Sequence, residues 1–298
     1  MSKTDDDEIE ASRAPLLDHL IELRTRLIIS VAALLLGFGL SFYFATQIMT
    51  FLLHPFEVAN GLLLLQKTAG AQHGNFDLLL AMTGIHPLPP MAPNSLVMIN
   101  TAPLETFFAK VKLAGFGAVA ITFPVLAWQV YSFVAPGLYK KERRAFLPFL
   151  MSSPVLFLMG AALVYYIMLP FVLWFSLNQQ IVGVGAVTVA QQLKISEYLA
   201  LVTTLVMGFG LCFQMPVVLA LLGLAGIVSS QMLIGGRRYA ILGIAILAAV
   251  VTPPDPVSMC TLIVPLVLLY EVSIWCVKLM EFRRRREDEA EAKAVSAA

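Results

Sequence analysis

Long runs of apolar residues, separated by short charged clusters, dominate the pattern along this chain. A helix needs about 20 apolar residues to cross a hydrocarbon core of roughly 30 Å. The apolar runs predict six membrane-spanning helices, at about residues 27–47, 108–133, 146–170, 197–222, 238–252 and 257–276. We therefore expect an all-α membrane protein whose concave six-helix bundle forms a single domain over residues 27–276.

The fifth and sixth predicted spans are unusually short. Sixteen uncharged residues separate Arg238 from Asp255, and fifteen separate Asp255 from Glu271. A sixteen-residue helix reaches about 24 Å, which is less than the usual core. We expect either local thinning of the bilayer or a hydrated concavity around Asp255 and Glu271.

The basic residues indicate how the spans are oriented. Six crossings place both termini on one side, and positive charges gather on the cytoplasmic side of membrane proteins. With the N-terminus inside, four of the twenty basic residues fall outside, namely Lys67, Lys110, Lys112 and Lys194. We therefore predict an N-in and C-in protein, with a cytoplasmic segment at 1–26 and a charged cytoplasmic tail at 277–298. Since residues 1–10 are acidic, they are not typical of a cleaved signal peptide.

Prolines mark the predicted breaks in the chain. The segment at about 56–105 contains four closely spaced prolines, which favours an ordered or extended outer loop over a further span. Pro55 is expected to end the first span. Three more prolines are expected to bend or end the second and third spans and to shape a concave face, namely Pro124, Pro154 and Pro170.

Composition narrows the class of protein further. The chain of 298 residues is 59% hydrophobic and 13% charged, with a mean hydropathy of +0.82, so it cannot cover a soluble domain of this size with polar surface. A net charge of +1 gives no global field for nucleic acid. Neither cofactor nor metal is expected, because the histidines in or near the outer loop are scattered, at His54, His73 and His86. The motifs of hydrolases are also absent from the sequence.

Two carboxylates beside arginines are the first candidate binding groups. Glu22 lies two residues before Arg24, and Glu142 lies directly before Arg143. Carboxylates of this kind bind guanidinium groups through paired hydrogen bonds. A plainer interpretation, which the residues alone favour, is that Glu22 pairs with Arg26 along the helix and that Glu142 belongs to a cluster that only sets topology.

Four other residues have two possible roles each. Gln214 lies in an apolar span, so its amide must find a partner either in the bundle or in the helix of another subunit. Phe133 is either an interface aromatic or part of a binding surface. Asp255 is either an exposed turn residue or a functional one, and Glu271 is favoured as a structural anchor between helices.

Four motifs in order make the chain resemble the TatC family of the twin-arginine protein-export pathway. They are HLIELRTRL at 19–27, FVAPGLYKKERR at 133–144, FQMP at 213–216 and TPPD at 252–255. The resemblance implies a receptor subunit of a translocase, not an enzyme, that spans the bacterial cytoplasmic membrane several times. It also implies that proton-motive force drives export of folded precursors.

The resemblance assigns roles to particular residues. It implies a signal-peptide-binding set of Glu22, Arg24, Phe133, Glu142 and Arg143. It implies that Gln214 contacts single-span partner subunits of the TatA and TatB types, and that several copies of the chain assemble in contact with membrane lipid. Structural or functional importance is expected at Pro55, Pro136, Asp255 and Glu271.

A secondary transporter is the alternative. Broken helices and the intramembrane carboxylate of Glu271 would suit that function. However, no internal repeat is evident, and the ionisable residues gather at the predicted cytoplasmic edge instead of at a midplane site.

Overall fold

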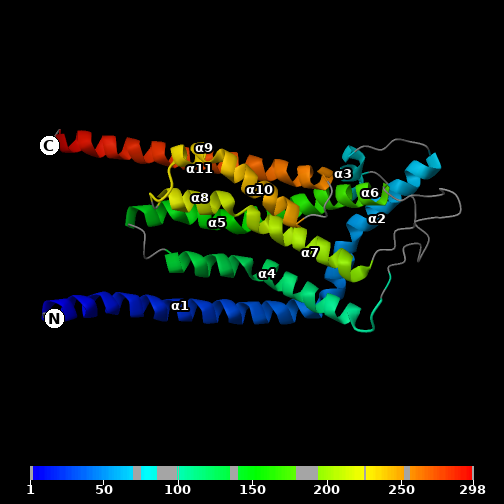
Figure 1. The fold of residues 1–298 in the computed structure, drawn as a ribbon, viewed down its shortest axis with the longest axis horizontal. Helices are drawn as coiled ribbons and strands as arrows, with labels where there is room; N and C mark the ends of the chain where they lie inside the picture. Colours follow the sequence, from blue (N-terminus) through cyan, green and yellow to red (C-terminus); the bar gives the residue numbers. More distant parts are fainter. Residues whose placement is uncertain are drawn as a thin grey trace.

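A computed structural model describes residues 3–69, 75–85, 99, 101–134, 140–178, 194–224, 226–251 and 256–296. Within these ranges the chain is helical, without strands apart from an isolated bridge between Ile99 and Lys194. The elements, labelled in Figure 1, are α1 Lys3–Tyr43, α2 Ala45–Ala69, α3 Asn75–Met82, α4 Glu105–Val134, α5 Lys140–Leu163, the π-helix η2 Val164–Met168, α6 Leu169–Asn178, α7 Ile195–Cys212, α8 Met215–Leu224, α9 Ser230–Gly235, α10 Arg237–Val251 and α11 Pro256–Ser296.

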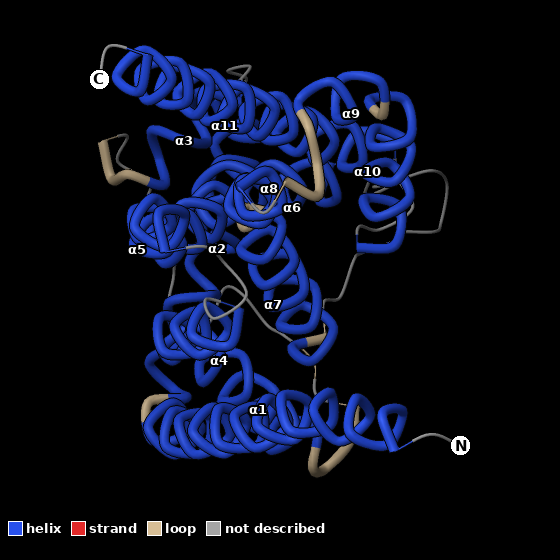
Figure 2. Tube along the Cα trace, turned by 90° about the vertical axis from the view of Figure 1, so that its left-hand side faces the viewer, coloured by secondary structure: helices blue, strands red, loops and turns tan. Residues whose placement is uncertain are grey.

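The long helices run side by side along the longest axis of the molecule, and both termini lie at the same end (Figure 1). Viewed from this end along the bundle, the helices form a row that begins with α1 and continues through α4 to α5 and α7 (Figure 2). The row then ends with α8, α11 and α10. At the opposite end of the molecule, α2 crosses the bundle obliquely (Figure 1).

Six described helices are long and apolar enough to cross a membrane, which confirms the predicted number. They cover Leu20–Tyr43, Ala45–Gln66, Glu105–Phe133, Met151–Asn178, Ile195–Leu224 and Met259–Arg283. The set differs from the prediction, because it includes α2, in the expected outer loop, and omits α10, which has 15 residues. Nevertheless, α10 runs alongside α11 whereas α2 is oblique (Figure 1). This arrangement favours α10 as the fifth, short span and α2 as an outer cap.

Two of the spans are interrupted where proline follows. The third span contains the π-helix Val164–Met168, which ends two residues before Pro170, a residue without an N–H for a regular turn. In the fourth span, α7 ends at Cys212 and α8 begins at Met215, one residue before Pro216. The N–H of Gln214 bonds the carbonyl of Leu211, three residues back, at 2.9 Å. The tightened turn carries the side chain of Gln214.

Glycines allow these helices to approach closely. A Cβ at Gly37 of α1 would come within 2.6 Å of Thr122 on α4. A Cβ at Gly210 of α7 would come within 2.5 Å of the buried ring of Phe157 on α5. Without a hydrophobic force between helices in lipid, such close van der Waals packing stabilises the bundle.

The prediction that Pro55 ends the first span is wrong. The first helix ends at Tyr43, and Pro55 lies buried inside α2. Proline has no N–H, so the carbonyl of Phe51 loses its usual helical donor. The hydroxyl of Tyr165 replaces this donor at 2.8 Å, and the hydroxyl of Tyr198 donates to the next carbonyl, that of Leu52, at 2.6 Å. The helix therefore continues through Pro55, because Tyr165 supplies the donor that the Phe51 carbonyl lacks and Tyr198 binds the neighbouring carbonyl.

Candidate functional site

A polar cluster joins α1 to α4 near the end of the bundle that carries both termini. Arg26 forms an ion pair with Glu22, with 3.2 Å between Nη2 and Oε1. The other terminal nitrogen of Arg26 donates to the amide oxygen of Gln129 on α4 at 3.4 Å. Gln129 is buried, whereas the side chains of Glu22 and Arg26 are 32% and 31% exposed. The carboxylate is thus held in place and still accessible.

Helical spacing explains this arrangement. Glu22 and Arg26 are four residues apart and therefore share one face of α1. On α4, the half-buried Phe133 follows Gln129 at the same spacing, so the aromatic ring lies one turn from the cluster. Arg24 is exposed and lies roughly 200° around the helix from Glu22. The structure therefore brings Phe133, but not Arg24, to the side of α1 that carries Glu22.

The second predicted carboxylate lies on α5. This helix begins at Lys140, at the end of the bundle that also carries the start of α1 and the end of α4 (Figure 1). The side chains of Glu142 and Arg143 lie outside the described residues, as do Pro136 and Asp255. Position 142 is nevertheless in the first turn of α5, and hence near the same end of the molecule as Glu22.

Gln214 finds its partner inside the bundle. Its amide oxygen accepts a hydrogen bond from the hydroxyl of Ser153 on α5 at 2.5 Å, and its amide nitrogen donates to the carbonyl of Ser153 at 3.0 Å. Ser153 is buried and Gln214 is half-buried. An amide can donate twice and accept twice, so this reciprocal pair leaves one further donor and acceptor position.

Glu271 is also paired. A terminal nitrogen of Arg237, the first residue of α10, lies 2.8 Å from a carboxylate oxygen of Glu271 on α11. One residue earlier, the hydroxyl of Tyr270 donates to the carbonyl of Leu233 on α9 at 2.8 Å. Glu271 thus joins the beginning of α10 to α11, and its neighbour Tyr270 joins α11 to α9.

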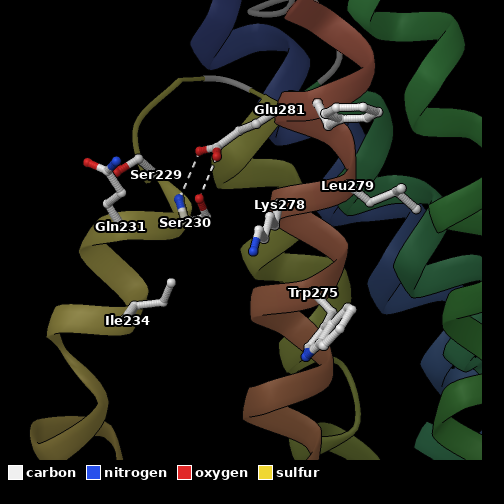
Figure 3. A pocket seen from close by; sticks show the side chains of 9 residues that line it. Ser229, Ser230, Gln231, Ile234, Trp275, Lys278, Leu279 and Glu281 are labelled. Carbon is white, nitrogen blue, oxygen red and sulfur yellow. Dashed lines mark hydrogen bonds between the residues drawn. The ribbon is translucent and has the colours of Figure 1, made fainter.

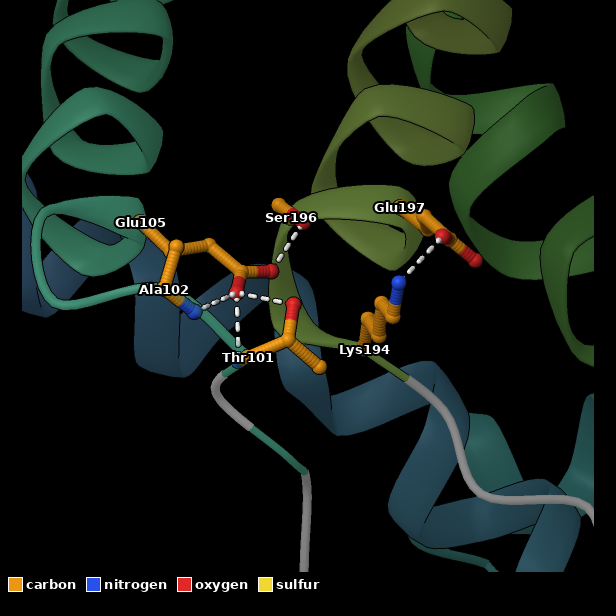
Figure 4. Close-up of polar contacts among 6 residues, drawn as sticks. All are labelled: Thr101, Ala102, Glu105, Lys194, Ser196 and Glu197. Carbon is orange, nitrogen blue, oxygen red and sulfur yellow. Dashed lines mark hydrogen bonds and ion pairs between the residues drawn. The ribbon is translucent and has the colours of Figure 1, made fainter.

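At the opposite end, a carboxylate ties two spans together (Figure 4). Glu105, the first residue of α4, accepts hydrogen bonds from the backbone and hydroxyl of Thr101, at 2.7 and 3.0 Å, and from the backbone of Ala102 at 3.2 Å. Its second oxygen accepts from the hydroxyl of Ser196 in the first turn of α7. Nearby, Lys194 pairs with Glu197 at 3.5 Å. Because its oxygens are occupied locally, Glu105 has a structural role.

Comparison with known proteins places this chain in a family. The family model described as "Sec-independent protein translocase protein (TatC)" matches residues 18–265. The chain belongs to the TatC family. It is 39% identical to TatC of Magnetococcus marinus over 286 residues, covering 96% of this chain and 92% of that protein. It is 33% identical to TatC of Aquifex aeolicus over 273 residues, covering 92% and 98%.

Solved structures agree. A crystal structure of a twin-arginine translocase receptor TatC superposes with a TM-score of 0.64 and 32% identity, covering 88% of this chain and 98% of that one. A second structure of such a receptor, in the detergent DDM, gives a TM-score of 0.66 at 32% identity, covering 86% and 98%. With six membrane-capable helices, this TatC-family chain is a multi-pass protein of the bacterial inner membrane and a translocase component, not an enzyme.

Three residues that bind side chains discussed above were not predicted from the sequence of this TatC-family chain. Gln129 holds Arg26, Ser153 holds Gln214, and Arg237 holds Glu271. Gln129 gave a usable signal, because it is an isolated amide in an apolar run and must find a partner there. Among the described residues, no three histidine, cysteine or acidic side chains gather in a way that could hold a metal ion.

Proposed function

We propose that this chain is the receptor subunit of the translocase and binds the paired arginines of twin-arginine signal peptides. At the cytoplasmic face, Glu22 and Glu142 accept hydrogen bonds from the guanidinium groups of the two signal-peptide arginines. The observation that carries the proposal is the accessible carboxylate of Glu22, held between α1 and α4 through Arg26 and Gln129. The first turn of α5, which contains Glu142, is at the same end of the bundle.

The ion pair already present supports this chemistry. A guanidinium group binds a carboxylate through two parallel charge-assisted hydrogen bonds, which the ammonium group of lysine cannot reproduce. A signal-peptide arginine would have to compete with Arg26 for Glu22. Because Arg26 also reaches Gln129, it keeps a polar partner when Glu22 turns to the peptide. The exchange therefore leaves the half-buried guanidinium of Arg26 with one polar partner.

Phe133 completes the surface from the side of α4. Its ring lies one helical turn from Gln129 and suits contact with the apolar part of a signal peptide. Arg24 and Arg143 belong to the proposed binding set as flanking cations. In this proposal Arg24 is reached by the peptide from another side of α1, since it is exposed away from Glu22.

Partner recruitment follows signal-peptide binding. Single-span subunits of the TatA and TatB types dock on the membrane faces of the bundle, near Gln214, and several copies of the chain assemble with them. The unused donor and acceptor positions of the Gln214 amide support a polar contact there in addition to its bond with Ser153. Proton-motive force then drives passage of the folded precursor.

A binding assay tests the receptor function. The purified chain is titrated with a fluorescent twin-arginine signal peptide and with the same peptide carrying two lysines. We expect the twin-lysine peptide to bind at least about tenfold more weakly, and Glu142→Gln or Glu22→Gln to remove most of this preference. Glu197→Gln, an exposed acid at the opposite end, is the matched control. Equal affinity for both peptides would contradict the proposal.

A further inference from the structure

A groove separates the short helix α9 from α11, near the end of the bundle that carries both termini (Figure 3). The groove is open to one side and has a volume of about 660 Å³, within the range of roughly 300 to 1,000 Å³ for small-molecule sites. The proposed signal-peptide site does not use it, because that site lies on α1, α4 and α5. We call it the α9–α11 groove, and it is lined by Ser229, Ser230, Gln231, Ile234, Trp275, Lys278, Leu279, Glu281 and Phe282.

The lining changes from polar to apolar along the axis of the bundle. Ser230 and Gln231 lie near the level of Glu281, and Ile234 and Trp275 lie deeper, toward the middle of the molecule (Figure 3). Lys278 is between these levels (Figure 3). Trp275 is 74% exposed, and exposed tryptophan is typical of the boundary between hydrocarbon and headgroups. The groove therefore has the same polarity gradient as a phospholipid in the adjoining leaflet.

The charged residues at the groove indicate which kind of lipid headgroup it favours. In the lining of the groove, Lys278 is the one cation and Glu281 the one carboxylate. Glu281 is already engaged, because its oxygens accept from the backbone N–H of Ser230 at 2.8 Å and from the hydroxyl of Ser230 at 2.5 Å. Arg286 lies over the ring of Phe282, 4.8 Å from its centre, which holds a further positive charge at the rim. An anionic ligand is therefore favoured over a neutral or cationic one.

We propose that the α9–α11 groove binds one anionic phospholipid. The phosphate and glycerol of the headgroup contact Lys278 and the polar side chains of Ser229 and Gln231, and an acyl chain lies against Trp275 and Ile234. The groove is thus distinct from general attraction of the basic tail to the membrane surface, because it has a defined place for both parts of the lipid.

Quenching of Trp275 by brominated lipid tests this site in the intact chain. The variant Trp128→Phe with Trp174→Phe leaves Trp275 as the only tryptophan. It is reconstituted in phosphatidylcholine with increasing fractions of phosphatidylglycerol whose acyl chains carry bromine. We expect half-maximal quenching at a fraction about fivefold lower than for a second variant that retains only Trp128, an exposed tryptophan on α4. Lys278→Gln should abolish this preference, and Lys278→Arg should keep it.

Three results would overturn the proposal. The first is equal quenching of Trp275 by brominated phosphatidylcholine and phosphatidylglycerol. The second is an unchanged preference in Lys278→Gln, or in the unsubstituted groove at high salt, where screening should weaken it. The third is quenching of Trp275 that shows no preference for phosphatidylglycerol and is lost when single-span partner subunits are added. The groove would then be a protein-docking surface.

Discussion

The hydroxyl of Tyr165 donates a hydrogen bond to the carbonyl oxygen of Phe51 at 2.8 Å, and this bond replaces the one that Pro55 cannot form. The two rings also stack, with centroids 4.3 Å apart. Tyr165 belongs to the π-helix of the third span and Phe51 to the oblique helix α2. The irregularities of the two helices are therefore matched, since the residue that needs a donor faces the one that supplies it.

Removal of this hydroxyl should loosen the outer helix α2. In Tyr165→Phe, the carbonyl of Phe51 loses its donor, and we expect the free energy of unfolding to fall by about 1 to 3 kcal/mol. Thermal unfolding of the detergent-solubilised chain measures this change. Tyr166→Phe, an adjacent exposed tyrosine, is the matched control and should be nearly neutral.

A double-mutant cycle tests whether the hydroxyl of Tyr165 replaces the donor that Pro55 lacks. Pro55→Ala restores an N–H four residues after Phe51, so the effect of Tyr165→Phe should be smaller in that background than in the original chain. Additive effects of the two substitutions would show that the Tyr165 hydroxyl does not replace the missing donor of Pro55. No effect of Tyr165→Phe in either background would show that Tyr165 stabilises α2 by ring stacking alone.

Gln129 should tune signal-peptide affinity without contacting the peptide. In Gln129→Leu, Arg26 loses its second partner and should hold Glu22 more firmly, so we expect the affinity for a twin-arginine peptide to fall about three- to tenfold. A peptide titration measures this, with Gln47→Leu, an exposed glutamine of α2, as control. Affinity at the original level, with the variant folded, would remove Gln129 from the proposed exchange.

Local and distant contacts differ in how well the sequence predicts them. The ion pair between Glu22 and Arg26 follows from helical spacing and could be predicted. The partners of Arg26 and Gln214 are 103 and 61 residues away along the chain, so they depend on how the helices pack. Such contacts cannot be derived from periodicity, which identifies the face of a helix but not its neighbour.

The outer loop shows the same limit at the level of whole elements. Proline normally ends a helix, so Pro55 suggested that the chain left the helical state there. The donor that rescues the helix is Tyr165, 114 residues after Phe51. Conversely, the short span α10 was predicted because charged residues bound its apolar run, which is a purely local signal.

Gln214 should contribute to partner binding and to the α5 contact separately. Gln214→Leu removes both, and we expect recovery of single-span subunits on co-purification to fall by an amount that corresponds to about 0.6 to 2 kcal/mol, with peptide binding preserved. Ser153→Ala breaks the internal hydroxyl contact but keeps the amide, so it should preserve partner recovery. Equal losses in the two variants would indicate that Gln214 only holds α5 against the fourth span.

The short fifth span leads to a test of the topology, whereas the sixth, predicted to be short as well, has an apolar stretch of 25 residues within α11. With 15 residues, α10 reaches about 22 Å, so we expect the residues that follow it to be accessible to water even below the usual membrane surface. In a background without the three cysteines, Ser258→Cys should react with a membrane-impermeant thiol reagent from outside, since thiolate formation requires a hydrated site. Gly235→Cys, where a side chain meets open space, should react only from the cytoplasmic side.

Ile85→Cys, an exposed position after α3, serves as the outside control. If positions 85 and 235 were both labelled from outside, they would lie on the same side of the membrane. The predicted number of crossings between them would then be wrong. The N-in and C-in orientation would then fail. Because Glu22 and Glu142 must face the cytoplasm to meet a signal peptide before export, the receptor site proposed here would fail with it.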